Sequence, residues 1–392
     1  MKQISLLGCL LAFTLACDPI DQNVVTSSCQ ETTPLNALYS KAQPVQQLLD
    51  RYTREGLPGI AFAVYTPKEG YWATASGYAN IETKTPMQVC HLQYSQSVAK
   101  TYMATALLTL VEAGKINLDA PISQYLPGKI SGMITNADQI TVRMLLNHTS
   151  GIPGYSLETE YVAFLLQHPL RPFTSEEYLT YISGRPLLFE PGRYFQYSDT
   201  NYLLLALIAD QVDGDHARLI REKTLVPLGL KQSFYKDSPT YLNQPNLVDS
   251  YFDRFGDGKL ENVTQMQRVN VGSLKGDDGL IASPTDYVKF MRGLFEGKLV
   301  SGQSLTKMTT GVNDKQGVPS YGMGLYLVNY NGHTGYGHGG AGIGAGCELY
   351  YFPAEQLYVF LGTNMGTLTD GPYVRLANKV KGELLDLLLE LK

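Results

Sequence analysis

Ser97 and Lys100 lie one helical turn apart at the start of an apolar segment. The segment continues to Ala113 and is followed by Gly114, a pattern that predicts a buried helix with a glycine cap. Residues with this spacing share one helix face, with about 5–6 Å between their Cβ atoms. Burial lowers the pKa of a lysine, so we expect Lys100 to act as a base toward the Ser97 hydroxyl. The pair predicts nucleophilic attack on an acyl carbon.

The spacing Ser-x-x-Lys is weakly specific, because it occurs three times in the chain. The other copies are Ser233–Lys236, in a loop-like stretch, and Ser304–Lys307, at the start of a short exposed helix. We interpret both as helix caps or solvated pairs. Ser97 differs because it alone opens a long apolar helix. Taken by itself, however, it is explained equally well as a capping serine beside a lysine with a solvated head group.

Two later segments add polar residues to this pair. Tyr197-Ser198-Asp199 precedes an apolar helical segment, and His338-Gly339-Gly340-Ala341 follows a tyrosine- and glycine-rich stretch. With Ser97-x-x-Lys100, these segments resemble the three motifs of the serine β-lactamase and penicillin-binding-protein superfamily. The most similar branch joins class C β-lactamases, D-alanyl-D-alanine carboxypeptidases and β-lactamase-like esterases. Its motifs are Ser-x-x-Lys, Tyr-x-Asn and Lys- or His-x-Gly, and the resemblance extends from about residue 48 to residue 366.

The resemblance implies a role for each matching residue. Tyr197 would pass protons between Ser97, Lys100 and the leaving group. Asp199 stands where the family usually has asparagine, so it can accept a hydrogen bond from Lys100 but cannot donate one to a substrate amide. The third motif, His338, Gly339 and Gly340, would lie on the strand at the edge of the cleft. The backbone N–H groups of Ala341 and Ser97 would form the oxyanion hole, in which each donor is worth about 2.7–4 kcal/mol.

The predicted reaction is acyl transfer to Ser97 followed by hydrolysis, without a cofactor. The substrates would be amides or esters, including D-alanyl-D-alanine-type peptides. Because Ala341 follows the third motif and the motif lacks lysine, binding of the carboxylate that ends β-lactams and D-alanyl-D-alanine is weakened. An esterase or a D-amino-acid peptidase is therefore about equally supported. A non-catalytic penicillin-binding or sensor protein is a further alternative, although such a protein would not need Ser97, Lys100 and Tyr197.

Other candidate sites in the sequence have simpler explanations. We interpret His148 as a structural histidine, because no Gly-x-Ser-x-Gly elbow is present for it to serve. The six histidines show no spacing typical of metal ligands. The pattern Gly-x-Gly-x-x-Gly at Gly337–Gly342 precedes an expected strand instead of a helix, which excludes a dinucleotide fingerprint. Asp253–Gly258 lacks the ligands of a calcium loop and is interpreted as a turn.

The hydrophobic pattern predicts an α+β fold of the β-lactamase/transpeptidase-like type. Strands from the N- and C-terminal parts would form one antiparallel sheet, flanked by terminal helices, with a mainly helical inserted region at residues 90–311 and a cleft between the layers. The expected strands are 60–65, 71–78, 323–330, 345–352 and 358–362, and the expected terminal helices are 35–54, interrupted or begun at Pro44, and 373–391.

The N-terminal segment resembles a targeting signal. Residues 1–17 form a signal peptide that ends in Thr14-Leu15-Ala16-Cys17, which is similar to a lipobox and predicts lipidation of Cys17. Ordinary signal cleavage nearby is the alternative. Residues 18–34 would be a polar tether, and 35–392 the hydrolase domain. Of the five cysteines, Cys29, Cys90 and Cys347 would remain in the domain and its tether, which allows at most one disulfide. The expected location is the cell envelope, facing the periplasm or the cell surface, with the lipid as the only membrane contact.

The composition limits the classes of binding partner that we expect for this protein. The chain has 392 residues, of which 44% are hydrophobic and 17% charged, so global disorder is excluded. With 31 basic and 36 acidic side chains and no basic run, nothing indicates nucleic-acid binding. No later run reaches the ~18 apolar residues that a membrane helix needs. The expected partner is a small-molecule or peptide substrate.

Overall fold

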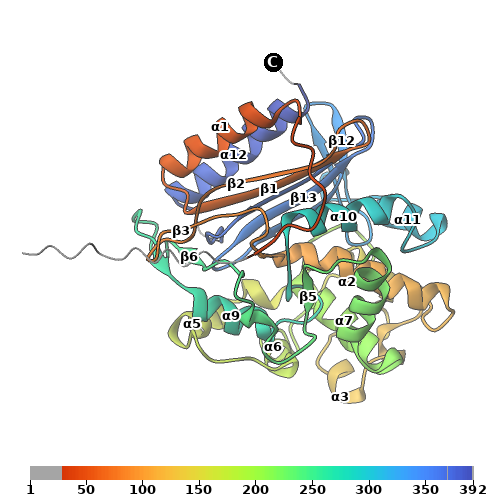
Figure 1. The fold of residues 1–392 in the computed structure, drawn as a ribbon. Coiled ribbons are helices and arrows are strands. Elements are labelled where there is room, and N and C mark those ends of the chain that lie inside the picture. The colour runs from red at the N-terminus through yellow and green to blue at the C-terminus, as the bar shows by residue number, and fades with distance from the viewer. Residues whose placement is uncertain (1–28, 369, 391–392) are drawn as a thin grey trace, which may run out of the picture.

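Helices cover both faces of a central antiparallel sheet (Figure 1). The structure is a computed structural model that describes residues 29–368 and 370–390. Helices α1 (Ala42–Arg54) and α12 (Pro372–Leu388) pack against each other on one face. Helix α10 (Pro284–Phe295) packs on the other face, where α2 (Ala99–Glu112) leads into a mainly helical layer. This is the two-layer arrangement that the sequence predicts.

The main sheet joins the two ends of the chain. Strand β1 pairs with β14, with Ile60 opposite Thr363, so segments far apart in the sequence are neighbours in the sheet. In the described residues the sheet has nine strands, which in spatial order are β3 (Thr85–Pro86), β2 (Gly70–Asn80), β1 (Gly59–Thr66), β14 (Leu357–Thr363), β13 (Gly346–Phe352), β12 (His333–Ala341), β11 (Tyr326–Tyr330), β10 (Pro319–Tyr321) and β9 (Val312–Asn313). The five strands expected from the sequence are all among them.

Strand β12, which carries the third motif, cannot be recognised from its hydrophobic pattern. Its sequence is rich in glycine and histidine, which give no alternation of apolar and polar residues. The glycines are needed because neighbouring strands approach closely. A Cβ atom on Gly337 would lie 2.0 Å from the carbonyl oxygen of Leu349 on β13. Only the family resemblance indicated a strand here.

The starts of two expected elements differ in detail. Helix α1 begins at Ala42, close to the alternative start at Pro44 and not at Leu35, because the Asn36 side chain accepts a hydrogen bond from the Leu38 N–H and favours a turn. Strand β11 starts at Tyr326 instead of Met323, since the N–H of Gly322 turns back to the carbonyl of Leu325.

The helical layer contains the remaining elements. The helices are α3 (Gly128–Ser131), α4 (Val142–Leu146), α5 (Thr159–Gln167), α6 (Ser175–Thr180), α7 (Asp199–Asp213), α8 (His216–Ile220), α9 (Thr264–Ser273) and α11 (Gly302–Thr309). Two small sheets accompany them, formed by β4 (Gln93–Tyr94), β8 (Leu280–Ala282) and β5 (Ser233–Tyr235), and by β6 (Tyr251–Phe252) and β7 (Glu261–Asn262). Helices α2 and α7 are buried along most of their length, which makes them a rigid support for the residues at their starts.

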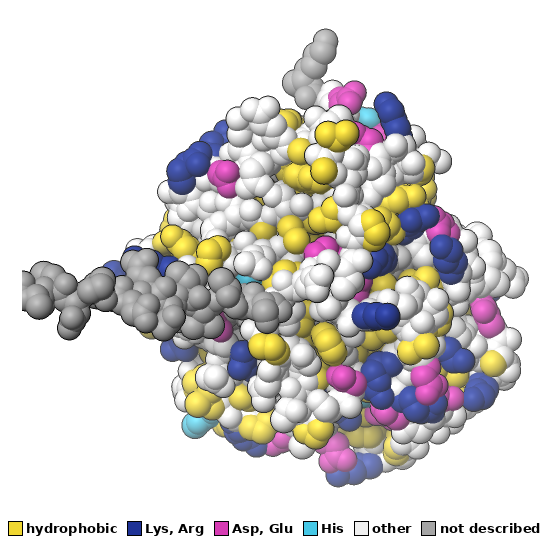
Figure 2. Space-filling view, viewed as in Figure 1, with side chains coloured by type: hydrophobic (Ala, Val, Ile, Leu, Met, Phe, Trp, Pro, Cys, Tyr) yellow, Lys and Arg dark blue, Asp and Glu magenta, His cyan; other side chains and the backbone are white. Residues whose placement is uncertain are grey.

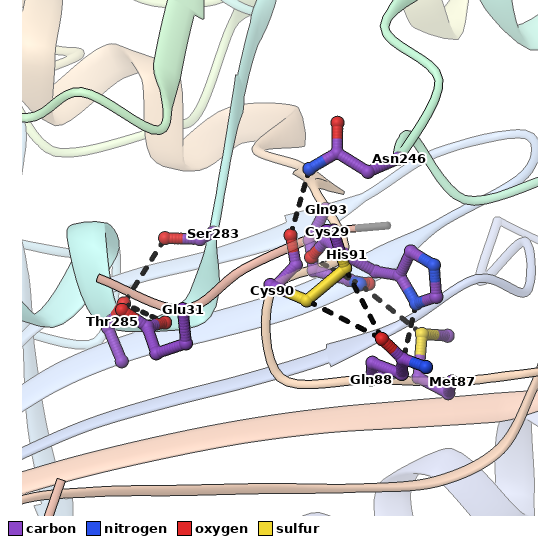
Figure 3. Close-up of a disulfide and its surroundings, with 10 residues drawn as sticks. All are labelled: Cys29, Glu31, Met87, Gln88, Cys90, His91, Gln93, Asn246, Ser283 and Thr285. Atoms are coloured by element: carbon purple, nitrogen blue, oxygen red, sulfur yellow. Dashed lines mark hydrogen bonds between the residues drawn. A yellow bond between two sulfur atoms is a disulfide. The ribbon is translucent and has the colours of Figure 1, made fainter. Parts of the chain in front are cut away.

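A disulfide joins Cys29 to Cys90 (Figure 3), and the sequence analysis had allowed at most one disulfide. Cys347 is a buried free thiol that contacts the carbonyl of Ser95 at 3.0 Å. Beyond Cys29, Glu31 accepts a hydrogen bond of 2.8 Å from the Thr285 hydroxyl at the start of α10 (Figure 3). Residues 29–34 of the expected polar tether, 18–34, are therefore attached to the domain by this disulfide and this hydrogen bond. The disulfide closes a loop of 61 residues, a constraint worth about 4 kcal/mol in the chain-entropy account.

The predicted signal peptide, Cys17 and residues 18–28 lie outside the described residues, so these assignments stay predictions. None of the helices that the structure describes combines the length and the apolarity needed to cross a bilayer. On the face shown in Figure 2, basic and acidic side chains are intermixed over both layers.

Candidate active site

Ser97 lies in a tight turn that leads into α2. The turn is a 3₁₀ segment, η1 (Gln96–Val98), and Gln96 adopts the left-handed conformation with φ 45°. Such a backbone conformation costs a non-glycine residue roughly 1–2 kcal/mol. Gly340 of β12 packs against this turn, where a Cβ atom would lie 2.7 Å from both the Gln96 Cβ and the Ser95 carbonyl oxygen. Glycine at this position therefore lets the third motif lie directly beside the serine.

The Lys100 ammonium group uses all three of its protons in hydrogen bonds. Nζ donates to Ser97 Oγ at 3.1 Å, to Asp199 Oδ1 at 2.7 Å and to the backbone oxygen of Asp277 at 3.1 Å. The Tyr197 hydroxyl also donates to Ser97 Oγ, at 2.8 Å. Tyr197 and Asp199 stand at the start of α7, so two helix starts, those of α2 and α7, bring Ser97, Lys100, Tyr197 and Asp199 together.

The charge state of Lys100 differs from the expectation. Burial lowers the pKa of Lys100, but the negative charges of Asp199 and Asp277 outweigh burial, and the pKa is raised. The sequence argument counted burial alone, so the predicted direction was wrong. Lys100 is an ammonium group at neutral pH and must lose a proton before it can accept one from Ser97.

Asp199 is the ion-pair partner of Lys100. Burial raises the pKa of the Asp199 carboxyl, but the attraction of Lys100 and a hydrogen bond from the Ser156 hydroxyl outweigh burial, and the pKa is lowered. The Asp199 carboxylate and the Lys100 ammonium group are therefore both charged at neutral pH. Ser156, on η3 (Tyr155–Leu157), is a site residue that the sequence analysis missed.

The substitution Asp199→Asn is expected to move the acid limb of the pH profile of kcat/KM to lower pH by about one to two units. The asparagine removes the negative charge that holds the pKa of Lys100 up, while its side-chain oxygen can still accept the hydrogen bond from Nζ. A neutral Lys100 is then available at lower pH. A pH series with one ester substrate measures the shift. An unchanged acid limb in a folded variant would show that Lys100 is not the group that titrates.

His338 is uncharged and lines the space beside Ser97. Burial, with a smaller contribution from the charge of Lys100, lowers the pKa of His338 to about 3. Its Nδ1 lies 2.6 Å from the Gly339 carbonyl oxygen and its Nε2 lies 3.0 Å from the Tyr321 hydroxyl. A neutral ring that donates from Nδ1 and accepts at Nε2 satisfies both contacts. His338 therefore brings no positive charge to the third motif.

His148 supports the start of α7. Its Nδ1 accepts from the Ser198 N–H at 3.3 Å and lies 3.0 Å from Asn201 Nδ2, while its ring packs beside Tyr197 with a centroid distance of 4.5 Å. Burial holds the pKa of His148 well below its usual value. These contacts position Tyr197 and agree with the structural role expected from the sequence.

The other Ser-x-x-Lys copies have structural roles. Ser233, on β5, donates to Asp286 at 3.2 Å. Ser304 lies inside α11, and Ser301, instead of Ser304, caps that helix. One further group, Asp210, Asp215 and His216, brings possible metal-ligand atoms together, but Asp210 accepts from His216 Nδ1 and Asp215 caps α8.

Two adjacent carboxyl groups, Asp277 and Asp278, also belong to the site. Oδ2 of Asp277 accepts from the Tyr155 hydroxyl at 2.6 Å, and Oδ1 of Asp278 accepts from the Gly279 N–H at 2.6 Å. Burial raises the pKa of both groups, that of Asp278 to about 7. The sequence analysis missed them, although two consecutive aspartates between glycines, directly before an apolar strand, are an unusual signal.

Two cavities meet at Ser97, and both are also lined by Tyr197 and Ala341. The larger, about 460 Å³, extends along the third motif toward α12 and contains Glu348 and Lys381. The smaller, about 270 Å³, extends toward α5 and is lined by Tyr155, Ser156, Tyr161, Asp199, Asp277 and Asp278. Ser97 therefore lies where the two cavities join, so two parts of one bound molecule can each occupy one side.

The family model described as Beta-lactamase matches residues 44–379, which is most of the chain. The chain belongs to this Beta-lactamase family. Its fold, an α+β arrangement of the β-lactamase/transpeptidase-like type, agrees with the architecture expected from the sequence.

Relatives in the family carry several activities in their names. The chain is similar to "Penicillin-binding protein 4" of Amycolatopsis lactamdurans, with 27% identity over 85% of this chain and 87% of that protein. It is similar to the putative penicillin-binding protein PbpX of Bacillus subtilis, with 29% identity over 73% of this chain and 67% of that protein. It also matches "Esterase EstB" of Burkholderia gladioli, with 30% identity over 49% of this chain and 51% of that protein.

The fold is shared with solved structures. The D-amino acid amidase from Ochrobactrum anthropi SV3, in complex with D-phenylalanine, superposes with a TM-score of 0.77 over 89% of this chain and 99% of that chain, at 24% identity. At this identity the likeness shows the fold alone. Family membership, together with the esterase relative, supports a hydrolase.

Proposed function

We propose that this protein is a serine hydrolase that forms an acyl-enzyme on Ser97 and cleaves amide or ester bonds. The observation that carries the proposal is the pair of hydrogen bonds that Lys100 and Tyr197 donate to Ser97 Oγ, at 3.1 and 2.8 Å, where two cavities meet. Once Lys100 has lost a proton, Ser97 Oγ attacks the carbonyl carbon, and the proton of Ser97 passes through Lys100 or Tyr197 to the leaving amine or alcohol. The backbone N–H groups of Ser97 and Ala341 are the proposed oxyanion donors. Water then releases the acid.

An electrophilic probe tests this proposal. The wild-type protein is incubated with a fluorophosphonate or an activated ester, and its intact mass is compared with that of untreated protein. One adduct that peptide mapping places on Ser97 is the expected result. A protein that remains unmodified, or is modified on another side chain, would contradict the proposal and favour a non-catalytic binding or sensor protein.

The larger cavity favours substrates without a terminal carboxylate over penicillins and D-alanyl-D-alanine peptides. Glu348 of β13 lies directly across from Gly339, where a Cβ atom on the glycine would be 2.9 Å from Glu348 Oε2. Lys381 of α12 donates to Oε1 of this glutamate at 2.6 Å. Lys381, the one lysine or arginine in the described lining of this cavity, is therefore already paired, and a second carboxylate placed there would meet Glu348.

The substitution Glu348→Gln is expected to raise the rate of acylation by benzylpenicillin by about tenfold, which corresponds to ~1.4 kcal/mol. It removes the carboxylate that faces Gly339 and leaves Lys381 free to attract the carboxylate of the drug. Acylation is followed by intact mass over time. A neutral ester, such as p-nitrophenyl butyrate, serves as the control and should change much less. An equal change for both substrates, or no gain with penicillin, would contradict this account.

We also propose that the protein is exported and anchored through a lipid on Cys17. The disulfide Cys29–Cys90 supports export, because disulfides persist in oxidising compartments. Labelled fatty acid is expected to enter the wild-type protein but not Cys17→Ala. Equal labelling of both proteins would contradict the anchor.

A further inference from the structure

We propose that the smaller cavity binds the ammonium group of an aminoacyl substrate through the carboxylate of Asp277. The inference rests on the proposed acyl transfer to Ser97 and names the acyl group that this site would take: an amino acid with a free amino group, presented as an amide or an ester.

The charges that line this cavity are unbalanced. Its described lining contains three carboxyl groups, Asp199, Asp277 and Asp278, and neither lysine nor arginine. Lys100, which lies behind Ser97, forms its ion pair with Asp199. Lys100 reaches Asp277 with a hydrogen bond to the backbone oxygen, and its charge acts on the carboxyl groups of both Asp277 and Asp278. Neither carboxyl group forms a salt bridge with a lysine or arginine among the described residues, so the cavity carries more negative than positive charge.

The Asp277 carboxylate also lacks one hydrogen-bond donor. The residue is 4% exposed, and its Oδ2 accepts from the Tyr155 hydroxyl. Oδ1 is buried and accepts no hydrogen bond from another described residue. Leaving such an oxygen unpaired costs roughly 1–3 kcal/mol, more when it is charged. An ammonium group of a ligand would supply both the missing proton donor and the missing positive charge.

The aromatic lining suits a cation as well. Tyr155 and Tyr161 line the cavity with their rings at 87° and 5.5 Å between centroids. Faces of tyrosine rings attract ammonium groups by about 0.5–2 kcal/mol, depending on desolvation. A cavity of about 270 Å³ has room for one small aminoacyl group. Because Ser97 lines the same cavity, an α-amino group bound here would be close to the carbonyl carbon that Ser97 attacks.

A pair of substrates that differ only in the amino group tests the proposal. We would compare kcat/KM for D- and L-alanine p-nitroanilide with kcat/KM for propionyl p-nitroanilide, at pH 7 and fixed ionic strength. The wild-type protein is expected to prefer one of the alanine compounds by at least tenfold. Asp277→Asn is expected to reduce this preference by about tenfold, mainly through a higher KM.

Asp286→Asn is the matched control, because it removes another buried carboxyl group that lines neither cavity at Ser97. Asp286 accepts from Lys289 and from the Gln232 N–H, away from the proposed subsite, so the preference should stay as in the wild type. If wild type hydrolyses the propionyl compound without preferring either alanine compound, the subsite is wrong and the hydrolase stands. An equal loss of preference in both variants would also overturn it. If no substrate reacts and no probe labels Ser97, the proposed function itself fails.

Discussion

Replacing Ser97 with alanine is expected to lower kcat for ester or amide hydrolysis by at least about 10⁴-fold, since the variant has no nucleophile to carry the acyl group. The fold should be kept, because the Ser97 hydroxyl accepts its hydrogen bonds at the junction of two cavities, where water can replace it. Initial rates with an activated ester measure the activity, and thermal unfolding measures the fold.

Ser304→Ala is the matched control for this substitution. Ser304 opens another Ser-x-x-Lys sequence, on α11, and lines neither cavity at Ser97. Its removal should leave kcat within about twofold, as for a substitution that touches no reacting group. If Ser97→Ala kept the wild-type rate, another residue would be the nucleophile and the proposed mechanism would be wrong.

Replacing Lys100 with methionine is expected to lower both activity and stability. Activity should fall by about 10²–10⁴-fold, because the proton of Ser97 loses its acceptor. The free energy of unfolding should fall by about 3–5 kcal/mol at pH 7, because Lys100 is 1% exposed and its loss leaves the Asp199 carboxylate buried without a partner. Without the lysine, the pKa of Asp199 rises above its value in the unfolded chain. The destabilisation should therefore be smaller at pH 5, where Asp199 takes up a proton, and larger as the pH rises.

A double variant and a surface control separate these effects. Lys100→Met with Asp199→Asn removes both charges, so it should recover part of the stability but none of the activity. Lys115→Met breaks the ion pair with Asp213 at the surface, where Lys115 is 51% exposed. That pair is worth at most about 1 kcal/mol, and activity should not change. If Lys100→Met were as stable and active as Lys115→Met, the assignment of Lys100 would be wrong.

Sequence patterns were sufficient to predict the strands and helices whose hydrophobic residues recur regularly along the chain. The strands at Ile60 and Tyr358 have long apolar runs between turn residues, and the helix after Ser97 is apolar on several sides. The site residues followed from three short motifs, and the structure brings Ser97, Lys100, Tyr197 and Asp199 into contact. These features depend on residue types that are close together in the chain.

Features that depend on distant neighbours could not be predicted. Strand β12 is defined by what lies beside it, since Gly337 and Gly340 leave space for β13 and for the turn at Gln96. The raised pKa of Lys100 depends on carboxylates from α7 and from the segment before β8. Asp277 gave no signal by spacing to Ser97, because the fold, and not the local sequence, places it at the cavity.

The pairing of β1 with β14 also has a consequence for how the protein is made. During synthesis β1 leaves the ribosome long before β14, and until then β2 is its available partner in the main sheet. Contacts between such distant segments form late, since the entropy of closing the loop must be overcome first. The turn at Ser97 is completed by Gly340, so the nascent chain cannot present a finished site until nearly all of it has been translated. Ser97, the proposed nucleophile, therefore lacks its complete surroundings until then.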